Sequence, residues 1–222
     1  MAERPILFSG PMVRAILDGT KRQTRRVVKP QPDNPEVFGI SPIWGHGVPL
    51  PHVDPQRRFG IHAAFNVKGK RVDRWLPCPY GAPGDRLWVR ETQRVIGRGP
   101  VTRRADTIRV RYEADGAESA LLPFPARLKG NPEIGKCLAY GGYRESSRIT
   151  LAIESVRVER LHDISEEDAR AEGAGVGVRV RIDGATATSY RYGFERAWRQ
   201  LNGKESWDAN PWVWVISFRR LP

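Results

Sequence analysis

Near the start of the chain, the pattern of apolar and polar residues changes from helical to extended within a few positions. Apolar residues recur at the spacing of one helix face across residues 11–17, and Pro11 stands where the first turn of a helix accepts proline. Gly19 is placed like a glycine that ends a helix in the left-handed conformation, and residues 23–28 follow an extended pattern. The stretch 16–26 is therefore predicted to form a helix-to-strand corner.

Further along the chain, alternation and apolar runs predict four more strands. Residues 86–92 and 107–112 alternate apolar and polar positions, as half-buried strands do. Residues 148–160 form the longest predicted strand, and their apolar phase slips near Glu154, which indicates a bulge and a sharp bend. Residues 211–218 are apolar on both faces, so this strand is expected to be covered on both sides.

Two helices are predicted in the second half of the chain. Residues 164–173 form a short helix with Ser165 as its N-cap, and acidic residues in its first turn suit the helix dipole. Ser189 begins an amphipathic helix with an apolar face that includes Trp198, and Gly203 ends it.

This order of elements predicts a single α+β domain over residues 1–222. The bent strands suit a small, mixed β-barrel that is strongly curved or closed, with helices at its side. Long insertions that are read as loops interrupt it at about 30–74, 113–147 and 174–188, because these segments show no sustained apolar period.

Composition and charge narrow the class of protein. The 222 residues are 40% hydrophobic, which favours a folded globule, and the formal net charge of +12 favours polyanionic partners such as nucleic acid or nucleotides.

The two cysteines and four histidines lack ligand spacing, so neither a metal nor another cofactor is expected. No apolar leader or long uncharged span occurs, which predicts a cytoplasmic protein without membrane contact. Oligomeric state is not determined by the sequence.

The predicted corner carries the densest polar chemistry of the chain. Lys21 and Thr24 lie three residues apart, so a tight turn is needed to bring their side chains together. Arg22 lies between them in sequence, and Arg25 and Arg26 follow Thr24. One interpretation is that the cations hold phosphates while Thr24 donates a hydrogen bond. A second is that Lys21, with a pKa lowered by burial and by its cationic neighbours, activates the Thr24 hydroxyl. A basic turn without any ligand is the third.

Three residues outside the corner are also candidates. Alternation places Glu91 on the inner side of its strand, where a carboxylate needs a partner, either at a site or in a structural ion pair with an arginine. Glu172 stands in the last turn of its helix, against the dipole. Trp88 is a candidate for stacking a base, although packing in the core is the more frequent role of a tryptophan on a strand.

Four blocks of the sequence together resemble the ASCH domain, a small barrel related to the PUA fold, and most closely the phage and prophage proteins that carry it. The blocks are residues 19–26, which match a G-x-K-x-x-T-x-R form, 83–91, 148–173 and 207–214. The resemblance implies that the chain binds RNA or a nucleotide-like ligand in a cleft beside the barrel. Some compact members resemble amidohydrolases that deacylate N4-acetylcytidine with a lysine, a threonine and a glutamate, which correspond here to Lys21, Thr24 and Glu172.

Binding of RNA or of a modified nucleotide is thus the first functional hypothesis, with Arg22, Arg25, Arg26, Trp88 and Glu91 as ligand-binding candidates. The alternative is an amidohydrolase acting on an acylated nucleoside. Ribonuclease activity is also implied for some members of the family, but no set of residues in this sequence indicates that activity. A role in phage assembly, in the host cytoplasm, is the weakest hypothesis, because no residue supports it directly.

Overall fold

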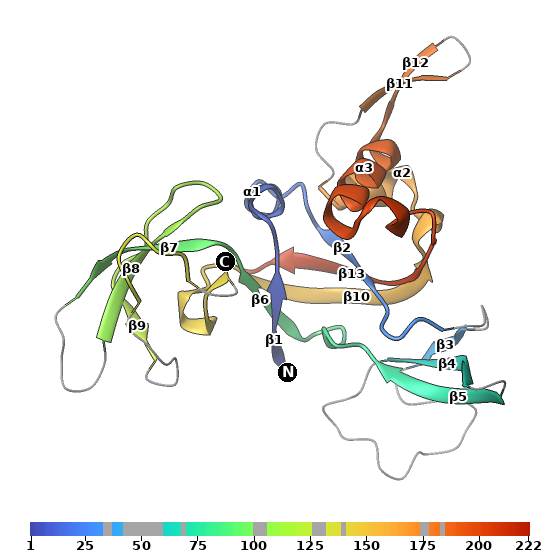
Figure 1. Ribbon diagram of the computed structural model, residues 1–222, viewed down its shortest axis with the longest axis horizontal. Coiled ribbons are helices and arrows are strands. Elements are labelled where there is room, and N and C mark those ends of the chain that lie inside the picture. Colours follow the sequence, from blue (N-terminus) through green and yellow to red (C-terminus); the bar gives the residue numbers. More distant parts are fainter. Residues whose placement is uncertain are drawn as a thin grey trace.

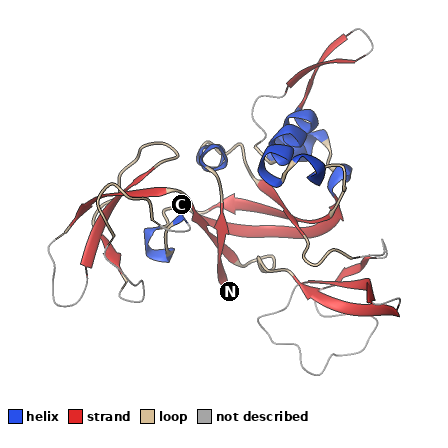
Figure 2. Cartoon of the chain, in the orientation of Figure 1, coloured by secondary structure: helices blue, strands red, loops and turns tan. Residues whose placement is uncertain are grey.

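The structure is a computed structural model of the chain. It describes residues 1–32, 37–41, 60–67, 70–99, 106–125, 132–138, 141–173, 178–182 and 185–222. Most of the regular structure is strand, and the helices gather on the central sheet (Figures 1 and 2). The predicted α+β class is therefore confirmed.

The centre of the protein is a five-stranded mixed sheet in the order β1-β6-β10-β13-β2. These strands are β1 (Glu3–Leu7), β2 (Gln23–Val27), β6 (Arg86–Arg90), β10 (Thr150–Arg160) and β13 (Trp212–Arg220). The β1–β6 pair is parallel, and the other three pairs are antiparallel. The last strand of the chain thus lies inside the sheet, between its longest described strand and β2.

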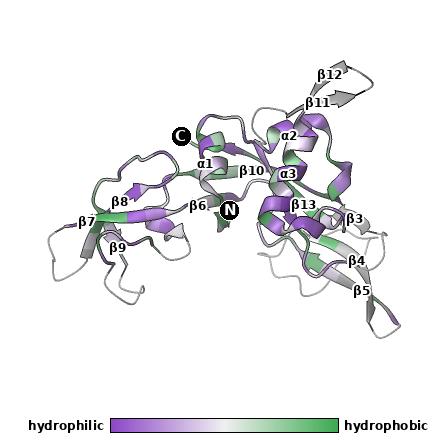
Figure 3. Cartoon of the chain, turned by 45° about the horizontal axis from the view of Figure 1, so that its top comes forward, coloured by the Kyte–Doolittle hydropathy of each residue, from purple (hydrophilic) through white to green (hydrophobic). Residues whose placement is uncertain are grey.

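Apolar clusters cover both faces of β13, as its sequence predicts. Trp214 and Ile216 belong to a core cluster that also contains Val13 of α1 (Gly10–Leu17). Val213 and Val215 belong to a second cluster on the opposite face, formed with α2 (Glu166–Ala171) and α3 (Tyr190–Asn202). Figure 3 shows hydrophilic and hydrophobic positions side by side around α2 and α3, as expected for helices that are covered on one side.

The sheet is bent, and its two edge strands are bridged at one point. The pairing of β10 with β13 shifts register between Ile153 and Ser155, which confirms the predicted bulge. Arg26 of β2 donates a hydrogen bond of 2.6 Å to the carbonyl oxygen of Leu7 at the end of β1. In the described part of the chain, however, β1 pairs only with β6 and β2 only with β13, so the sheet is open and not a closed barrel.

The segments predicted as loop insertions contain strands, so that part of the prediction is wrong in its local structure. The strands in these segments are β3 (Val37–Ser41), β4 (Gly60–Val67), β5 (Lys70–Pro77), β9 (Leu122–Phe124), β11 (Val178–Ile182) and β12 (Ala185–Ser189). Outside them, β8 (Asp106–Tyr112) confirms the strand predicted at 107–112, and it pairs with β7 (Gln93–Arg98) and β9. Together these strands form two three-stranded sheets and one hairpin that extend outward from the central sheet (Figure 1). Each of these strands pairs with a strand next to it in sequence. Main-chain hydrogen bonds hold such pairs together, so their sequences need not show a long alternation of apolar residues.

Helix ends are where the sequence places them. The Ser165 side chain accepts a hydrogen bond from the Asp168 amide, and Ser189 does the same for Tyr192. Short 3-10 helices complete the described structure: η3 (Arg144–Ser146), η4 (Leu161–Asp163) and η5 (Lys204–Ser206). None of the helices in the described ranges has the length and apolar character needed to span a membrane.

Candidate functional site

The predicted corner is a tight connection from α1 to β2. Gly19 follows the end of α1 with a φ of 74°, the left-handed conformation that its position predicts. The hydroxyl of Thr20 and the amide of Lys21 both donate to the carbonyl oxygen of Ala15, at 3.1 and 2.9 Å. These bonds fold the chain back on α1, so that Lys21 enters the interior before β2 begins.

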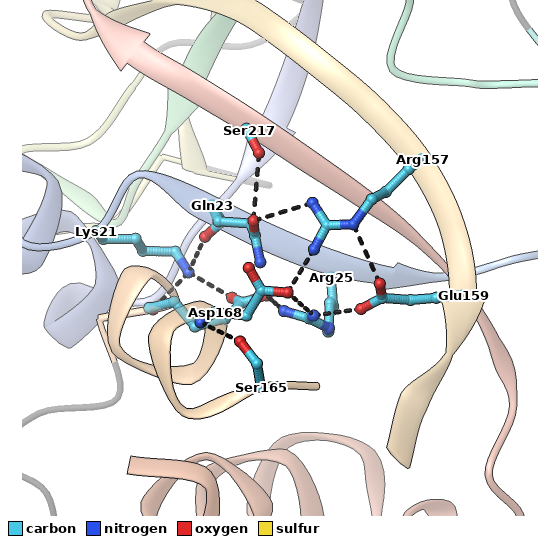
Figure 4. Close-up of polar contacts among 9 residues, drawn as sticks. Lys21, Gln23, Arg25, Arg157, Glu159, Ser165, Asp168 and Ser217 are labelled. Carbon is cyan, nitrogen blue, oxygen red and sulfur yellow. Dashed lines mark hydrogen bonds and ion pairs between the residues drawn. The ribbon is translucent and has the colours of Figure 1, made fainter. Parts of the chain in front are cut away.

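The Lys21 ammonium is fully enclosed and has three acceptors. It donates to the carbonyl oxygens of Gln23 and Glu172 at 2.8 and 2.7 Å, and to the Glu172 carboxylate at 2.9 Å (Figure 4). Burial lowers the pKa of Lys21, and the charge and hydrogen bond of Glu172 act in the opposite direction. Three acceptors for three N–H groups match the ammonium form, so all of its donors are already used.

Glu172 reaches Lys21 because α2 ends beside the corner. It is the C-cap residue of α2, and its main chain forms an isolated β-bridge with Lys21. The next residue, Gly173, has a φ of 68°, and a Cβ there would lie 2.8 Å from the Lys21 Cβ and 2.9 Å from the Ala15 Cβ. Only glycine therefore allows α1, the corner and α2 to approach so closely. Lys21 and Glu172, which the resemblance names together, are thus in direct contact.

Arg25 lies at the centre of a buried charge network next to this pair. Its guanidinium pairs with Asp168 at 2.8 Å, with Glu172 at 3.3 Å and with Glu159. Burial acts to lower the pKa of Arg25, but Glu172, Asp168 and Glu159 together raise it. Arg157 also pairs with Asp168, and with Glu159 at 3.1 Å. Arg25 is thus neutralised by carboxylates of this protein, although its Nε forms no hydrogen bond with the described residues.

The sequence reasoning missed most of the network that holds Arg25 (Figure 4). Gln23 links this network to β13, because its side-chain oxygen accepts a hydrogen bond of 3.2 Å from the Ser217 hydroxyl. Arg157 and Glu159 are two apart on β10 and therefore lie on the same face of the strand, and two opposite charges in one phase are the signal that could have indicated a shared partner.

Thr24 lies on the other face of β2. Side chains alternate along a strand, and Thr24 pairs with Ile216 whereas Arg25 pairs with Val215, two residues that belong to different core clusters. Thr24 is 2% exposed and lines a cavity. No described residue forms a hydrogen bond with its hydroxyl.

Arg26 shares this face and differs from Arg25 in its partners. Its guanidinium lies 5.2 Å from the centre of the Phe8 ring and donates to the Leu7 carbonyl oxygen. Within the described residues it forms no ion pair, and its Nε is buried without a partner. Burial lowers the pKa of Arg26, while Tyr80 and Glu172 partly oppose this. Arg26 is therefore a half-buried cation without a matching carboxylate among the described residues.

The cavity that Thr24 and Arg26 line has a volume of about 1370 Å³ and lies between α1, β2, α3 and the segment around Tyr80. Glu172 also reaches its wall. Five aromatic side chains contribute to the lining: Phe8, Tyr80, Phe194, Trp198 and Trp214. Charged lining residues comprise four cations and two carboxylates, namely Arg14, Arg25, Arg26, Lys29, Asp18 and Glu172.

The other predicted ligand-binding residues lie outside the lining of this cavity. Glu91 is 1% exposed and forms two hydrogen bonds of 2.9 Å with Arg148, so the alternative of a structural ion pair with an arginine is the one observed. Trp88 is half-buried on β6, between Pro5 of β1 and Thr150 of β10. Arg22 is exposed, and its Nε donates to the Gly19 carbonyl oxygen at 3.0 Å.

Comparisons of the chain with protein-family models, with curated proteins and with solved structures find no match.

Proposed function

We propose that the chain binds an anionic, nucleotide-like ligand, a mononucleotide or a segment of RNA, in the cavity beside β2. The observation that carries this proposal is Arg26. Removing a charge from water without an opposite charge beside it is costly, and Arg26 is half-buried with no carboxylate partner among the described residues, so a ligand that supplies a negative charge would be favoured there. Arg25 provides the internal comparison, because the same side chain one residue away is paired with three carboxylates.

The size and lining of the cavity support a ligand with a planar ring. Its volume of about 1370 Å³ exceeds the range of about 300–1,000 Å³ that is typical of small-molecule pockets, so a nucleotide and part of its neighbour both fit. Aromatic side chains on several walls offer surfaces on which a base can stack.

The resemblance to the ASCH domain and the PUA-like barrel is part of this proposal. The blocks that carry it lie far apart in sequence, yet they include the corner, β6, β10 with α2, and the start of β13. These elements belong to the central sheet or pack on it, and two of them form the walls around Lys21 and Glu172. A curved sheet whose edges are bridged by Arg26 is consistent with a barrel-like ancestry.

The test compares two variants that each remove one positive charge. Mononucleotide binding is measured by calorimetry for the wild type, Arg26→Gln and Arg22→Gln. Loss of a charge-assisted contact to phosphate is expected to weaken binding about tenfold or more in Arg26→Gln. Arg22 is exposed and lies outside the cavity lining, so Arg22→Gln is expected to bind as the wild type does. Equal affinities of all three proteins, with both variants folded, would contradict the proposal.

A second candidate function is hydrolysis of an acylated nucleoside. The observation that favours it is the contact of 2.9 Å between Lys21 and Glu172, together with a cavity that both Glu172 and Thr24 line and in which no described residue bonds the Thr24 hydroxyl. The Thr24 oxygen would attack the acyl carbon, and Glu172, which also reaches the wall, would pass the hydroxyl proton to the leaving amine. Water would then hydrolyse the acyl ester on Thr24, which releases the acid and restores the hydroxyl. Because every Lys21 donor is engaged, Lys21 holds Glu172 in place in this arrangement.

Release of cytidine from N4-acetylcytidine, followed by chromatography, tests this second function. Thr24→Val keeps the shape of the side chain and is expected to abolish release. Thr92→Val is the matched control, since Thr92 also lines the cavity but lies at an exposed position outside the corner. Absence of release by the wild type, or equal release by both variants, would remove this candidate.

A further inference from the structure

The outer edge of β2 carries main-chain groups that the sheet does not use. In an antiparallel pair, alternate residues direct their N–H and C=O groups toward the neighbouring strand, and the residues between them direct theirs away. The amide of Phe218 donates to the Arg22 carbonyl oxygen at 2.9 Å, and the amide of Val28 donates to that of Trp212 at 3.0 Å. Even-numbered positions of β2 therefore face β13, and the main chains of Arg25 and Val27 face outward.

Neighbouring segments cover only the beginning of this outer edge. Just before β2 begins, the amide of Arg22 turns away from β13 and donates to the Ala171 carbonyl oxygen at 2.8 Å, and the outward Gln23 carbonyl oxygen accepts from the Lys21 ammonium at 2.8 Å. Within the described residues, no comparable bond reaches the outward N–H and C=O groups of Arg25 and Val27. Main-chain groups that are buried without partners are rare, and Arg25 is only 4% exposed.

The free edge borders the cavity. Its lining includes residues 24–27, which are consecutive and whose side chains alternate between the two faces of the sheet. Consecutive residues of a strand can all border one space only if that space runs along the strand's edge. The lining also includes Phe8 from one face and Phe194 from the other, so the cavity extends around the edge.

Trp198 supplies a second unused donor beside this edge. It is 5% exposed, it lines the cavity, and its indole Nε1 is buried without a hydrogen-bond partner. Its ring lies 5.8 Å from that of Phe194, and Val27 packs against the same apolar cluster. A buried indole N–H usually has a partner, so this one indicates an acceptor that comes from a ligand.

We propose that the free edge of β2 at Arg25 and Val27, together with the indole of Trp198, is a subsite that reads a nucleobase. The bases of nucleotides present hydrogen-bond donors and acceptors side by side on one edge, and an outward-facing strand residue presents an N–H and a C=O in the same way. The base then takes the place that a further strand would occupy, with aromatic side chains against its faces. This inference rests on the proposed function, in which Arg26 holds the phosphate.

The subsite makes binding depend on the base and not only on the phosphate. The experiment measures the affinities of CMP, UMP, AMP and GMP, and of ribose 5-phosphate as the probe without a base. At least one nucleotide is expected to bind about tenfold or more tightly than ribose 5-phosphate.

Variants at the subsite separate the main-chain donor from the side chains. Val27→Pro removes an N–H that faces away from β13, so the ladder is kept, and Val27→Ala shortens the same side chain but retains the N–H. Val27→Pro is expected to lose about fivefold to tenfold in nucleotide affinity relative to Val27→Ala, the size of one hydrogen bond. Trp198→Phe removes the indole N–H, keeps an aromatic ring and is expected to lose a similar factor.

The outcomes distinguish this inference from the proposed function. If no nucleotide binds to the wild type, both fall. If nucleotides bind and Arg26→Gln weakens them, but ribose 5-phosphate binds equally well and the subsite variants match the wild type, only the base-reading subsite is overturned. Should Val27→Pro fail to fold, as judged by thermal unfolding, Trp198→Phe and the comparison with ribose 5-phosphate decide the result.

Discussion

Arg25 and Arg26 are adjacent and chemically identical, yet the structure gives them different environments. Arg25 points to the side of α2 and α3 and is enclosed by carboxylates, whereas Arg26 points to the side of Phe8 and has none among the described residues. Strand alternation alone predicts that they point apart. It does not predict which side holds the acidic partners, because Glu159 and Asp168 come from segments more than 130 residues away.

At the same scale, Glu172 is predicted to be the residue whose neutralisation destabilises the corner most. Glu172→Gln leaves the buried Lys21 ammonium without its carboxylate, and breaking a buried ion pair in this way costs about 3–5 kcal/mol. The free energy of unfolding, measured with denaturant at pH 7, is expected to fall by that amount. Glu205→Gln, at an exposed position, is the control and is expected to change it by less than about 0.5 kcal/mol. Similar small losses in both variants would contradict the assignment.

At the scale of elements, local signals predicted the central elements well. Proline at the start of α1, glycine at its end, serine N-caps and the apolar phase of β13 all act within a few residues, and each corresponds to an observed feature. Apart from β8, which alternation predicted, the strands of the outer sheets escaped prediction because main-chain pairing with sequence neighbours holds them. Pairing of Val67 with Lys70, for example, leaves no apolar repeat to detect.

The close approach of α1, the corner and α2 depends on one glycine. Gly173→Ala places a Cβ within 3 Å of two others at a positive φ, and it is expected to destabilise the fold by about 2–4 kcal/mol through strain and overpacking. Gly116→Ala is the matched control, since Gly116 has a φ of 77° with no atom within 4 Å of the added Cβ, and it is expected to cost about 1 kcal/mol. Thermal and denaturant unfolding compare the two. Equal losses would show that the packing at Gly173 is looser than described.

For the whole molecule, the net charge of +12 does not originate at the buried network. Lys21, Arg25 and Arg157 are there balanced by Glu159, Asp168 and Glu172. Composition therefore predicts an anionic kind of partner but predicts no place at which it would bind. The place follows from long-range packing, because the cavity is assembled from α1, β2, α3 and the segment around Tyr80, which no local pattern connects.

This separation of the excess charge from the buried network leads to a prediction about salt. If the surface charge guides a polyanion while Arg26 anchors one phosphate, an RNA oligonucleotide contacts several cations and a mononucleotide contacts one. The logarithm of affinity is expected to fall with that of salt concentration by about 0.7 per phosphate contact for single strands, so the slope is steeper for the oligonucleotide. Arg26→Gln is expected to reduce the oligonucleotide slope by about 0.7, a single contact, and Arg22→Gln tests whether an exposed arginine does the same. Equal slopes for both ligands would show that binding is confined to the cavity and that the remaining positive charge takes no part in it.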